Sequence, residues 1–304
     1  MKTRPLSIYG IGNPLIDIVI QATDDDLNAL NLDKGVMHLV DEIRQKEIIN
    51  YFKNCNTKYF PGGSAPNTML ACAGLGTTSL IAGKIGQDEF GDIYLRQAEK
   101  FGVLSGLVQG CGPTGSSIIL VTSDGERTMN THLGMCREYS ENDVDAGKLS
   151  QSTFFYFTGY MWDTESQKAA IKKATSIAKE NNVQIVFDVA DPFAVDRNKD
   201  EFLIMIEQDV DIVFANYAEL AILLDSENVD SSADELMKIV HRAGIKLGEK
   251  GSLVLDDGKK HHLPPQPISA IDSTGAGDMY AAGFLTALAK GYSTKRAGEI
   301  GGLL

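Results

Sequence analysis

Seven residues near the C-terminal end could hold an anion beside a carboxylate. Asp272-Ser273-Thr274-Gly275-Ala276-Gly277-Asp278 directly precedes an apolar run over residues 279–289. That run is apolar on nearly every side, which predicts a buried helix whose first turn contains the glycines. Glycine lets a ligand approach the backbone, and the unpaired N–H groups of a first helical turn bind anions. Asp278 could therefore take a proton from an alcohol while Gly275, Ala276 and Gly277 hold a phosphoryl group.

A structural role competes with this catalytic role for Asp278. Counted from Gly275 as the N-cap, Asp278 is the N3 residue, where an acid is ordinary. There it would stabilise the helix dipole by about 0.3–1 kcal/mol. The spacing alone leaves both roles open, so the other candidate residues have to decide between them.

The N-terminal segment contains two further candidates. Gly10-Ile11-Gly12 follows a predicted strand, but Leu15 occupies the third glycine position of a dinucleotide-binding fingerprint and the strand resumes after it. The chain therefore departs from the Rossmann motif. Asp17 interrupts an apolar strand, where it either faces solvent or binds a ligand such as the vicinal hydroxyls of a sugar.

A pair of glycines precedes the next predicted binding residues. Gly62-Gly63 is followed by Ser64, which we expect to cap a helix, and by Asn67 one turn later. The glycines would let the chain pass tightly against a ligand, which Asn67 could then hydrogen-bond. A plain helix entry is the alternative interpretation.

Composition limits the classes of partner. The 304 residues are 43% hydrophobic and 23% charged, with a formal net charge of −13. This acidity argues against nucleic acid as a partner, and a polyanion such as ATP would need a local site. The four cysteines are scattered, which predicts reduced thiols and a cytoplasmic location. We expect no signal peptide and no membrane-spanning segment.

Alternating strand and helix patterns dominate the chain after residue 77. This alternation predicts a mostly parallel sheet with helices on both faces. Residues 115–122 and 127–131 predict a hairpin joined by Asp124-Gly125, and with the early strands they could form a small lid.

Three more candidates lie in the second half of the chain and in the hairpin. Asn216 and Glu219 follow an apolar strand; they could form a near capping box or order a Mg²⁺ shell through water. Gly248 lies in a turn that could pass close to a nucleotide, and Arg127 at the foot of the hairpin could approach phosphate.

Together these motifs resemble the PfkB family of the ribokinase superfamily, most closely its adenosine-kinase branch. The family signature Asp-x-Thr-Gly-Ala-Gly-Asp matches residues 272–278, and the family's Asn-x-x-Glu matches Asn216 and Glu219. Gly62 and Gly63 match its glycine pair, and Asn67 matches the asparagine that follows it. Residues 12–18 look like the start of an adenosine kinase. The family often has Thr-x-Gly before the nucleotide turn, whereas this chain has Lys246-Leu247-Gly248.

The resemblance implies a ribokinase-like α/β fold, a three-layer α/β/α mostly parallel sheet with a small β-sheet lid. It implies a single domain over residues 1–304, with lid segments at roughly 12–40 and 112–132. The implied roles are Asp278 as base with Gly275, Ala276 and Gly277 as the anion hole; Asn13, Asp17, Gly63, Ser64 and Asn67 for substrate; Asp272, Thr274, Gly248 and Arg127 for ATP; and Asn216 and Glu219 for Mg²⁺.

The function implied is ATP-dependent phosphorylation of the 5′-hydroxyl of a ribonucleoside, with adenosine favoured. ATP and Mg²⁺ are the implied cofactors, and a monovalent cation such as K⁺ stays open. A PfkB-type sugar kinase and a non-catalytic nucleoside- or sugar-binding relative are the alternatives. A P-loop kinase is disfavoured because no Gly-Lys pair precedes Ser or Thr. We expect a small-molecule substrate and either a monomer or a homodimer.

Overall fold

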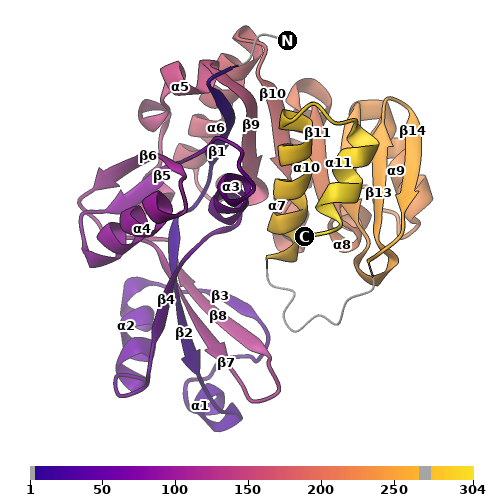
Figure 1. The fold of residues 1–304 in the computed structure, drawn as a ribbon. Coiled ribbons are helices and arrows are strands. Elements are labelled where there is room, and N and C mark those ends of the chain that lie inside the picture. The colour runs from indigo at the N-terminus through magenta and orange to yellow at the C-terminus, as the bar shows by residue number, and fades with distance from the viewer. Residues whose placement is uncertain (1–3, 267–274) are drawn as a thin grey trace.

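A nine-stranded sheet forms the centre of the large lobe (Figure 1). Its order is β14-β13-β12-β11-β10-β9-β1-β5-β6 in the computed structural model, which describes residues 4–266 and 275–304. In this spatial order, neighbouring strands pair in parallel from β12 through β6. Strands β13 and β14 extend the sheet with antiparallel pairing. The strands are β1 (Leu6–Ile11), β5 (Ser79–Gly86), β6 (Leu104–Gly110), β9 (Ser152–Thr158), β10 (Gln184–Asp188), β11 (Ile212–Asn216), β12 (Arg242–Lys246), β13 (Ser252–Asp256) and β14 (Lys259–Leu263).

Helices cover both faces of this sheet, as predicted. One face carries α3 (Ser64–Gly74), α10 (Ala276–Ala289) and α11 (Thr294–Gly301), whose core includes Met69, Phe214 and Phe284. The helices on the other face are α5 (Ala146–Ser150), α6 (Glu165–Glu180), α7 (Pro192–Asp209), α8 (Tyr217–Leu223) and α9 (Val229–Ile239). Among the described residues, no helix combines the length and apolarity needed to cross a membrane.

A five-stranded sheet forms the small lobe, which extends from the large lobe in Figure 1. Its order is β3-β8-β7-β2-β4, and β7 and β8 form the predicted antiparallel hairpin. Strand β4 was not predicted from the sequence. The elements are β2 (Leu15–Gln21), β3 (Met37–Leu39), β4 (Lys58–Gly62), β7 (Ser116–Val121) and β8 (Arg127–His132), with α1 (Asp24–Ala29), α2 (Glu42–Tyr51) and α4 (Glu89–Lys100) packed against them.

Polar residues gather where parallel strands of the large sheet end. Asp188, Asn216 and Lys246 end β10, β11 and β12, and Thr158 ends β9. Asn13 follows β1 by two residues. Because the carboxyl ends of parallel strands lie at one edge of a sheet, these side chains share the edge where open α/β sheets bind ligands.

The entry to α3 differs from the prediction. Gly63, not Ser64, is the N-cap of α3, with φ of 98°. A side chain at that φ is strained, and a Cβ on Gly63 would lie 2.0 Å from the carbonyl oxygen of Asn13. Ser64 is therefore the first helical residue, and its hydroxyl is available for another partner.

Helix α7 is an element that the sequence analysis did not identify. Asp191 caps it through the N–H groups of Phe193 and Ala194, and Pro192 occupies the first turn. Asn198 departs from helical geometry, with φ of −129°. This kink interrupts the apolar spacing, although the Asp-Pro start is a normal helix signal.

Replacing Gly63 with alanine should lower the free energy of unfolding by about 2 kcal/mol or more. The new Cβ would meet backbone at a positive φ, so the chain has to shift. Gly74→Ala, in the same helix, is the control, because a Cβ there meets nothing within 4 Å and alanine favours helix. Urea denaturation measures both, and equal stability of the two variants would contradict the account.

Candidate functional site

A cavity of about 590 Å³ lies between the carboxyl edge of the large sheet and the small sheet. This volume falls within the range of small-molecule sites. The cavity brings together seven of the predicted site residues, from three distant parts of the sequence. They are Asn13, Asp17, Gly63, Ser64, Asn67, Gly275 and Asp278.

Asp278 is fixed at the cavity by two residues of α3. The Ser64 hydroxyl donates to Oδ1 at 2.7 Å, and the Asn67 amide donates to Oδ2 at 3.2 Å. Burial raises the pKa of Asp278 to about 6, against the lowering effect of these two hydrogen bonds. The nearby Asp188 raises the pKa and Lys246 lowers it. Asp278 is thus a carboxylate near neutral pH whose basicity suits proton abstraction.

The first turn of α10 offers backbone donors beside that carboxylate. Gly275 is the N-cap, as predicted, with φ of 78° and no side chain to cap the helix. Ala276 and Gly277 open the helix, and Asp278 is the third helical residue. The turn therefore has the form of an anion site. Thr274 and Asp272, which the sequence analysis assigned to ATP, lie outside the described residues.

Asp17 and Asn13 reach the same cavity from the start of the small lobe. Burial raises the pKa of Asp17 to about 6; the charge of Arg127 lowers it and that of Asp278 raises it. A Cβ on Gly62 would lie 2.4 Å from Asp17 Oδ2, so glycine makes room for the carboxylate. Asn13 is buried, and its Oδ1 accepts from Gln167 Nε2 at 2.8 Å.

Apolar side chains form a second wall of the cavity, mostly from the small sheet. Leu15, Met37 and Leu39, which the sequence analysis considered for base recognition, all line it. Phe193 at the start of α7 also lines it and is 73% exposed. The other apolar residues of this wall are Val36, Ile119, Met129 and Leu133. The cavity thus offers polar groups for hydroxyls and an apolar surface for a ring.

Asn216 and Glu219 form a reciprocal capping box at the start of α8. Glu219 accepts from the Asn216 backbone N–H at 2.7 Å and from its Nδ2 at 2.6 Å, and donates its own N–H to Asn216 Oδ1. Burial raises the pKa of Glu219 to about 7, although Lys246 lowers it. Within residues 4–266 and 275–304, no cluster of three His, Cys, Asp or Glu side chains could hold a metal. The hydrogen bonds are those of the capping role that the spacing left open, and a role of the pair toward Mg²⁺ stays a prediction.

Two residues predicted to contact ATP, Gly248 and Arg127, do not line the cavity. Gly248 opens a single turn after β12 with φ of 60°, and a Cβ there would meet nothing within 4 Å. Arg127 begins β8, near enough to Asp17 for its charge to lower that pKa. Their contacts with ATP stay predictions.

Several residues of the site were not predicted from the sequence. Tyr160 and Asp191 line the cavity and share a hydrogen bond of 3.3 Å, with the Tyr160 hydroxyl donating. Phe193 could have been found from the Asp-Pro helix start before it. Asp188 and Lys246 form an ion pair across strands β10 and β12. No local sequence pattern predicts this ion pair, because it depends on how strands β10, β11 and β12 align.

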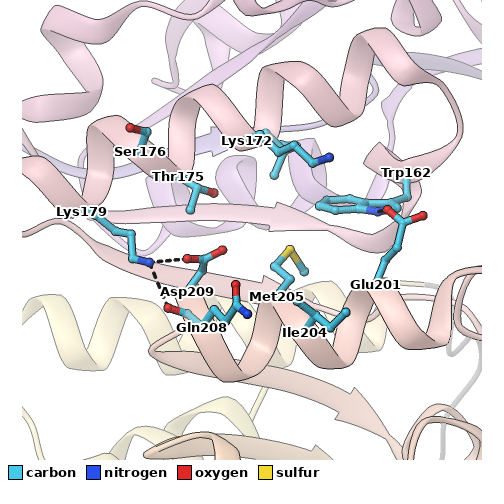
Figure 2. Close-up of a pocket in the computed structure, with 11 residues that line it drawn as sticks. Trp162, Lys172, Thr175, Ser176, Lys179, Glu201, Ile204, Met205, Gln208 and Asp209 are labelled. Carbon is cyan, nitrogen blue, oxygen red and sulfur yellow. Dashed lines mark hydrogen bonds and ion pairs between the residues drawn. The ribbon is translucent and has the colours of Figure 1, made fainter.

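A second hollow, of about 490 Å³, lies between α6 and α7, away from these residues (Figure 2). Trp162 donates to Glu201 at 2.9 Å, and Lys179 pairs with Asp209 and the Gln208 carbonyl. Glu201, Lys179 and Asp209 thus already have partners within the hollow. None of the predicted site residues in the described ranges lines it.

The chain is similar to a known protein family and to several solved structures. Residues 40–303 match the model of the pfkB family carbohydrate kinases. The chain belongs to this family. The crystal structure of adenosine kinase from Sinorhizobium meliloti is 34% identical, with a TM-score of 0.89, over 98% of this chain and 92% of that one. A protein described as a probable sugar kinase, from Rhizobium etli CFN 42, is 31% identical, with a TM-score of 0.91, over 99% and 92%.

An adenosine kinase from Dictyostelium discoideum is 27% identical over 97% of this chain and 92% of its own length. The resemblance drawn from the motifs and the ribokinase-like fold are thereby confirmed. This pfkB-family protein is an ATP-dependent kinase of the nucleoside and sugar kinase group, and kinases of this kind generally need Mg²⁺.

The pH dependence of this pfkB kinase should report Asp278. Below about pH 6 the carboxylate is protonated and cannot act as a base, so kcat/KM should fall as the pH drops through that value. Ser64→Ala removes a hydrogen bond that lowers the pKa, and the acidic limb should move to higher pH. Steady-state rates from pH 4.5 to 9 measure both profiles.

Asp17→Asn is the control, because Asp17 also has a pKa of about 6. The acidic limb should persist in that variant at reduced activity. The assignment to Asp278 would be contradicted if the acidic limb of the kcat/KM profile vanished in Asp17→Asn. It would also be contradicted if the limb stayed at the wild-type pH in Ser64→Ala.

Proposed function

We propose that this protein transfers the γ-phosphoryl group of ATP to the 5′-hydroxyl of a ribonucleoside, with adenosine favoured. The observation that carries the proposal is the position of Asp278. Its carboxylate joins the first turn of α10 to a cavity that contains both Asp17 and an apolar wall. An alcohol bound in that cavity would lie between a base and an anion site.

The polar side of the cavity, which contains Asn13, Asp17 and Asn67, suits a ribose. Asp17 can accept from two vicinal hydroxyls, and Asn13 and Asn67 supply amide groups beside it. Gly63 brings backbone close to the ligand without a side chain. With the ribose held there, its primary hydroxyl would point to Asp278, which accepts the proton as the oxygen attacks phosphorus.

Charge on the transferring phosphoryl group would be stabilised by backbone donors of Gly275, Ala276 and Gly277. Asn216 and Glu219 would order the waters of a bound Mg²⁺, because each Glu219 oxygen accepts one hydrogen bond from Asn216 and could accept a second from a water. When bound, Mg²⁺ would neutralise negative charge on the phosphate oxygens. Arg127 and Gly248 are the proposed contacts to ATP.

The apolar wall favours a nucleoside over a free sugar. A purine ring would contact Leu15, Met37 and Leu39, and the exposed Phe193 could cover its face. The similarity to adenosine kinases over nearly the whole chain supports this choice.

A sugar kinase is the second candidate. The similarity to the Rhizobium etli protein favours it, as do charged groups that line the cavity. These groups are Asp163, Asp191, Asp196 and Arg197, all of which could bind sugar hydroxyls.

Asp278→Asn should lower kcat by about 100-fold or more while nucleoside binding is kept, because a positioned base contributes about 10²–10⁴-fold. Coupled-assay kinetics with ATP and calorimetric titration with adenosine measure the two effects. Asp143→Asn is the matched control, since Asp143 also accepts from a serine hydroxyl but lies outside the cavity. A near-normal kcat in Asp278→Asn would refute the role of the base.

A substrate panel tests the choice between nucleoside and sugar. Adenosine, inosine, cytidine, ribose and fructose should be compared by kcat/KM, and adenosine should exceed both sugars by about 100-fold or more. Phe193→Ala should raise KM for adenosine roughly tenfold and leave ribose unchanged, because only a base reaches that wall. A faster reaction with ribose or fructose would favour the sugar kinase.

A further inference from the structure

A partly buried lysine lies beside the anion site. Lys246 Nζ is 3.3 Å from Asp188 Oδ1 and 3.4 Å from Oδ2, with the lysine side chain 17% exposed and that of Asp188 3% exposed. These contacts are longer than the roughly 2.7–2.9 Å of strong charge-assisted hydrogen bonds. An ammonium group also has three donors. Lys246 can therefore bind a second acceptor without leaving Asp188.

Strand register directs Lys246 toward α10. Asp188 aligns with Phe214 on β11, and Phe214 aligns with Gly244 on β12. Lys246 is two residues beyond Gly244, so its side chain emerges on the same face of the sheet. Phe214 belongs to the core beneath α3 and α10, which places the Lys246 stem under the first turn of α10.

The glycine of that turn leaves room for the ammonium. A Cβ on Gly277 would lie 3.1 Å from Lys246 Nζ and 3.8 Å from its Cδ. The lysine head therefore passes directly against the backbone whose N–H groups form the proposed anion hole. An anion held by those N–H groups would lie close to a full positive charge as well.

The surrounding charges are otherwise negative. Asp188 and Glu219 are both buried, and Asp278 is close by. The charge of Lys246 lowers the pKa of both Glu219 and Asp278, so one ammonium acts on several carboxylates. Phosphates entering this region would meet repulsion from those carboxylates, which a shared cation offsets.

We propose that Lys246 is a phosphate-binding residue of this kinase, held by Asp188 at rest and donating to a phosphoryl oxygen when nucleotide binds. This inference rests on the proposed anion hole at α10. Asp188 then has a positioning role: Tyr156 donates to its Oδ2 and the Ala190 N–H to its Oδ1. Ala190 has a φ of 72°, a strained value that keeps the backbone N–H on the carboxylate.

The competing explanation is that Lys246 only neutralises Asp188. Three variants separate the two roles: Lys246→Gln, Asp188→Asn, and the double variant. Calorimetric titration with the Mg²⁺ complex of AMP-PNP, a non-hydrolysable ATP analogue, gives the nucleotide Kd without turnover. Titration with adenosine, and thermal melting, report whether the rest of the site is intact.

We expect Lys246→Gln to raise the AMP-PNP Kd about 10- to 100-fold, the usual effect of losing a charge-assisted hydrogen bond. Asp188→Asn should leave that Kd within about threefold of wild type. The double variant should stay as weak as Lys246→Gln. Comparing it with Asp188→Asn isolates Lys246 in a background without an unpaired carboxylate, even if Lys246→Gln alone fails to fold.

Lys84→Gln is the matched control, because Lys84 and Asp143 form a pair of 3.1 Å, with both side chains 17% exposed, outside the cavity. This variant should bind AMP-PNP normally. Recovery of nucleotide binding in the double variant, or an unchanged Kd in Lys246→Gln, would overturn the inference. Failure of the proposed anion hole itself would differ: Ala276→Asp, which places a carboxylate at an exposed position of the same turn, would then bind AMP-PNP with wild-type affinity.

Discussion

The hydrogen bonds from α3 to the Asp278 carboxylate are the interaction on which the site depends. Ser64 and Asn67 lie more than 200 residues before Asp278 in the chain, yet both donate to it. Packing of α3 against α10 on one face of the large sheet makes this contact possible. The same packing aims the first turn of α10 at the cavity, so the base and the anion site are positioned by a single helix pair.

Parallel strands supply the second constraint. Their carboxyl ends place Asp188, Asn216 and Lys246 along one edge, close to the start of α10. Partly buried carboxylates at that edge repel one another, and burial raises the pKa of Glu219 and Asp278. Such an arrangement is costly for stability but suits a site that has to bind phosphate and a cation together.

Much of the site could be predicted because its signals are local. The glycines and Asp278 are adjacent in sequence, and their place at a helix start follows from the apolar run after them. The capping box of Asn216 and Glu219 likewise follows from a spacing of three residues. Parallel strands with helices on both faces follow from the alternating patterns.

The missed features depend on tertiary geometry. Lys246 and Asp188 are 58 residues apart and meet only through strand register. Ser64 was expected to cap α3, but the positive φ of Gly63 moves the helix start and leaves the hydroxyl for Asp278. Helix α7 was overlooked because the kink at Asn198 interrupts its pattern.

The most direct test of the central claim is a crystal structure with adenosine and the Mg²⁺ complex of a non-hydrolysable ATP analogue bound together. The account predicts that the 5′-hydroxyl lies within about 3.2 Å of an Asp278 oxygen, a hydrogen-bonding distance for a base. It also predicts the γ-phosphate against the N–H groups of Gly275, Ala276 and Gly277. A hydroxyl directed away from Asp278, or phosphates bound elsewhere than the first turn of α10, would contradict it.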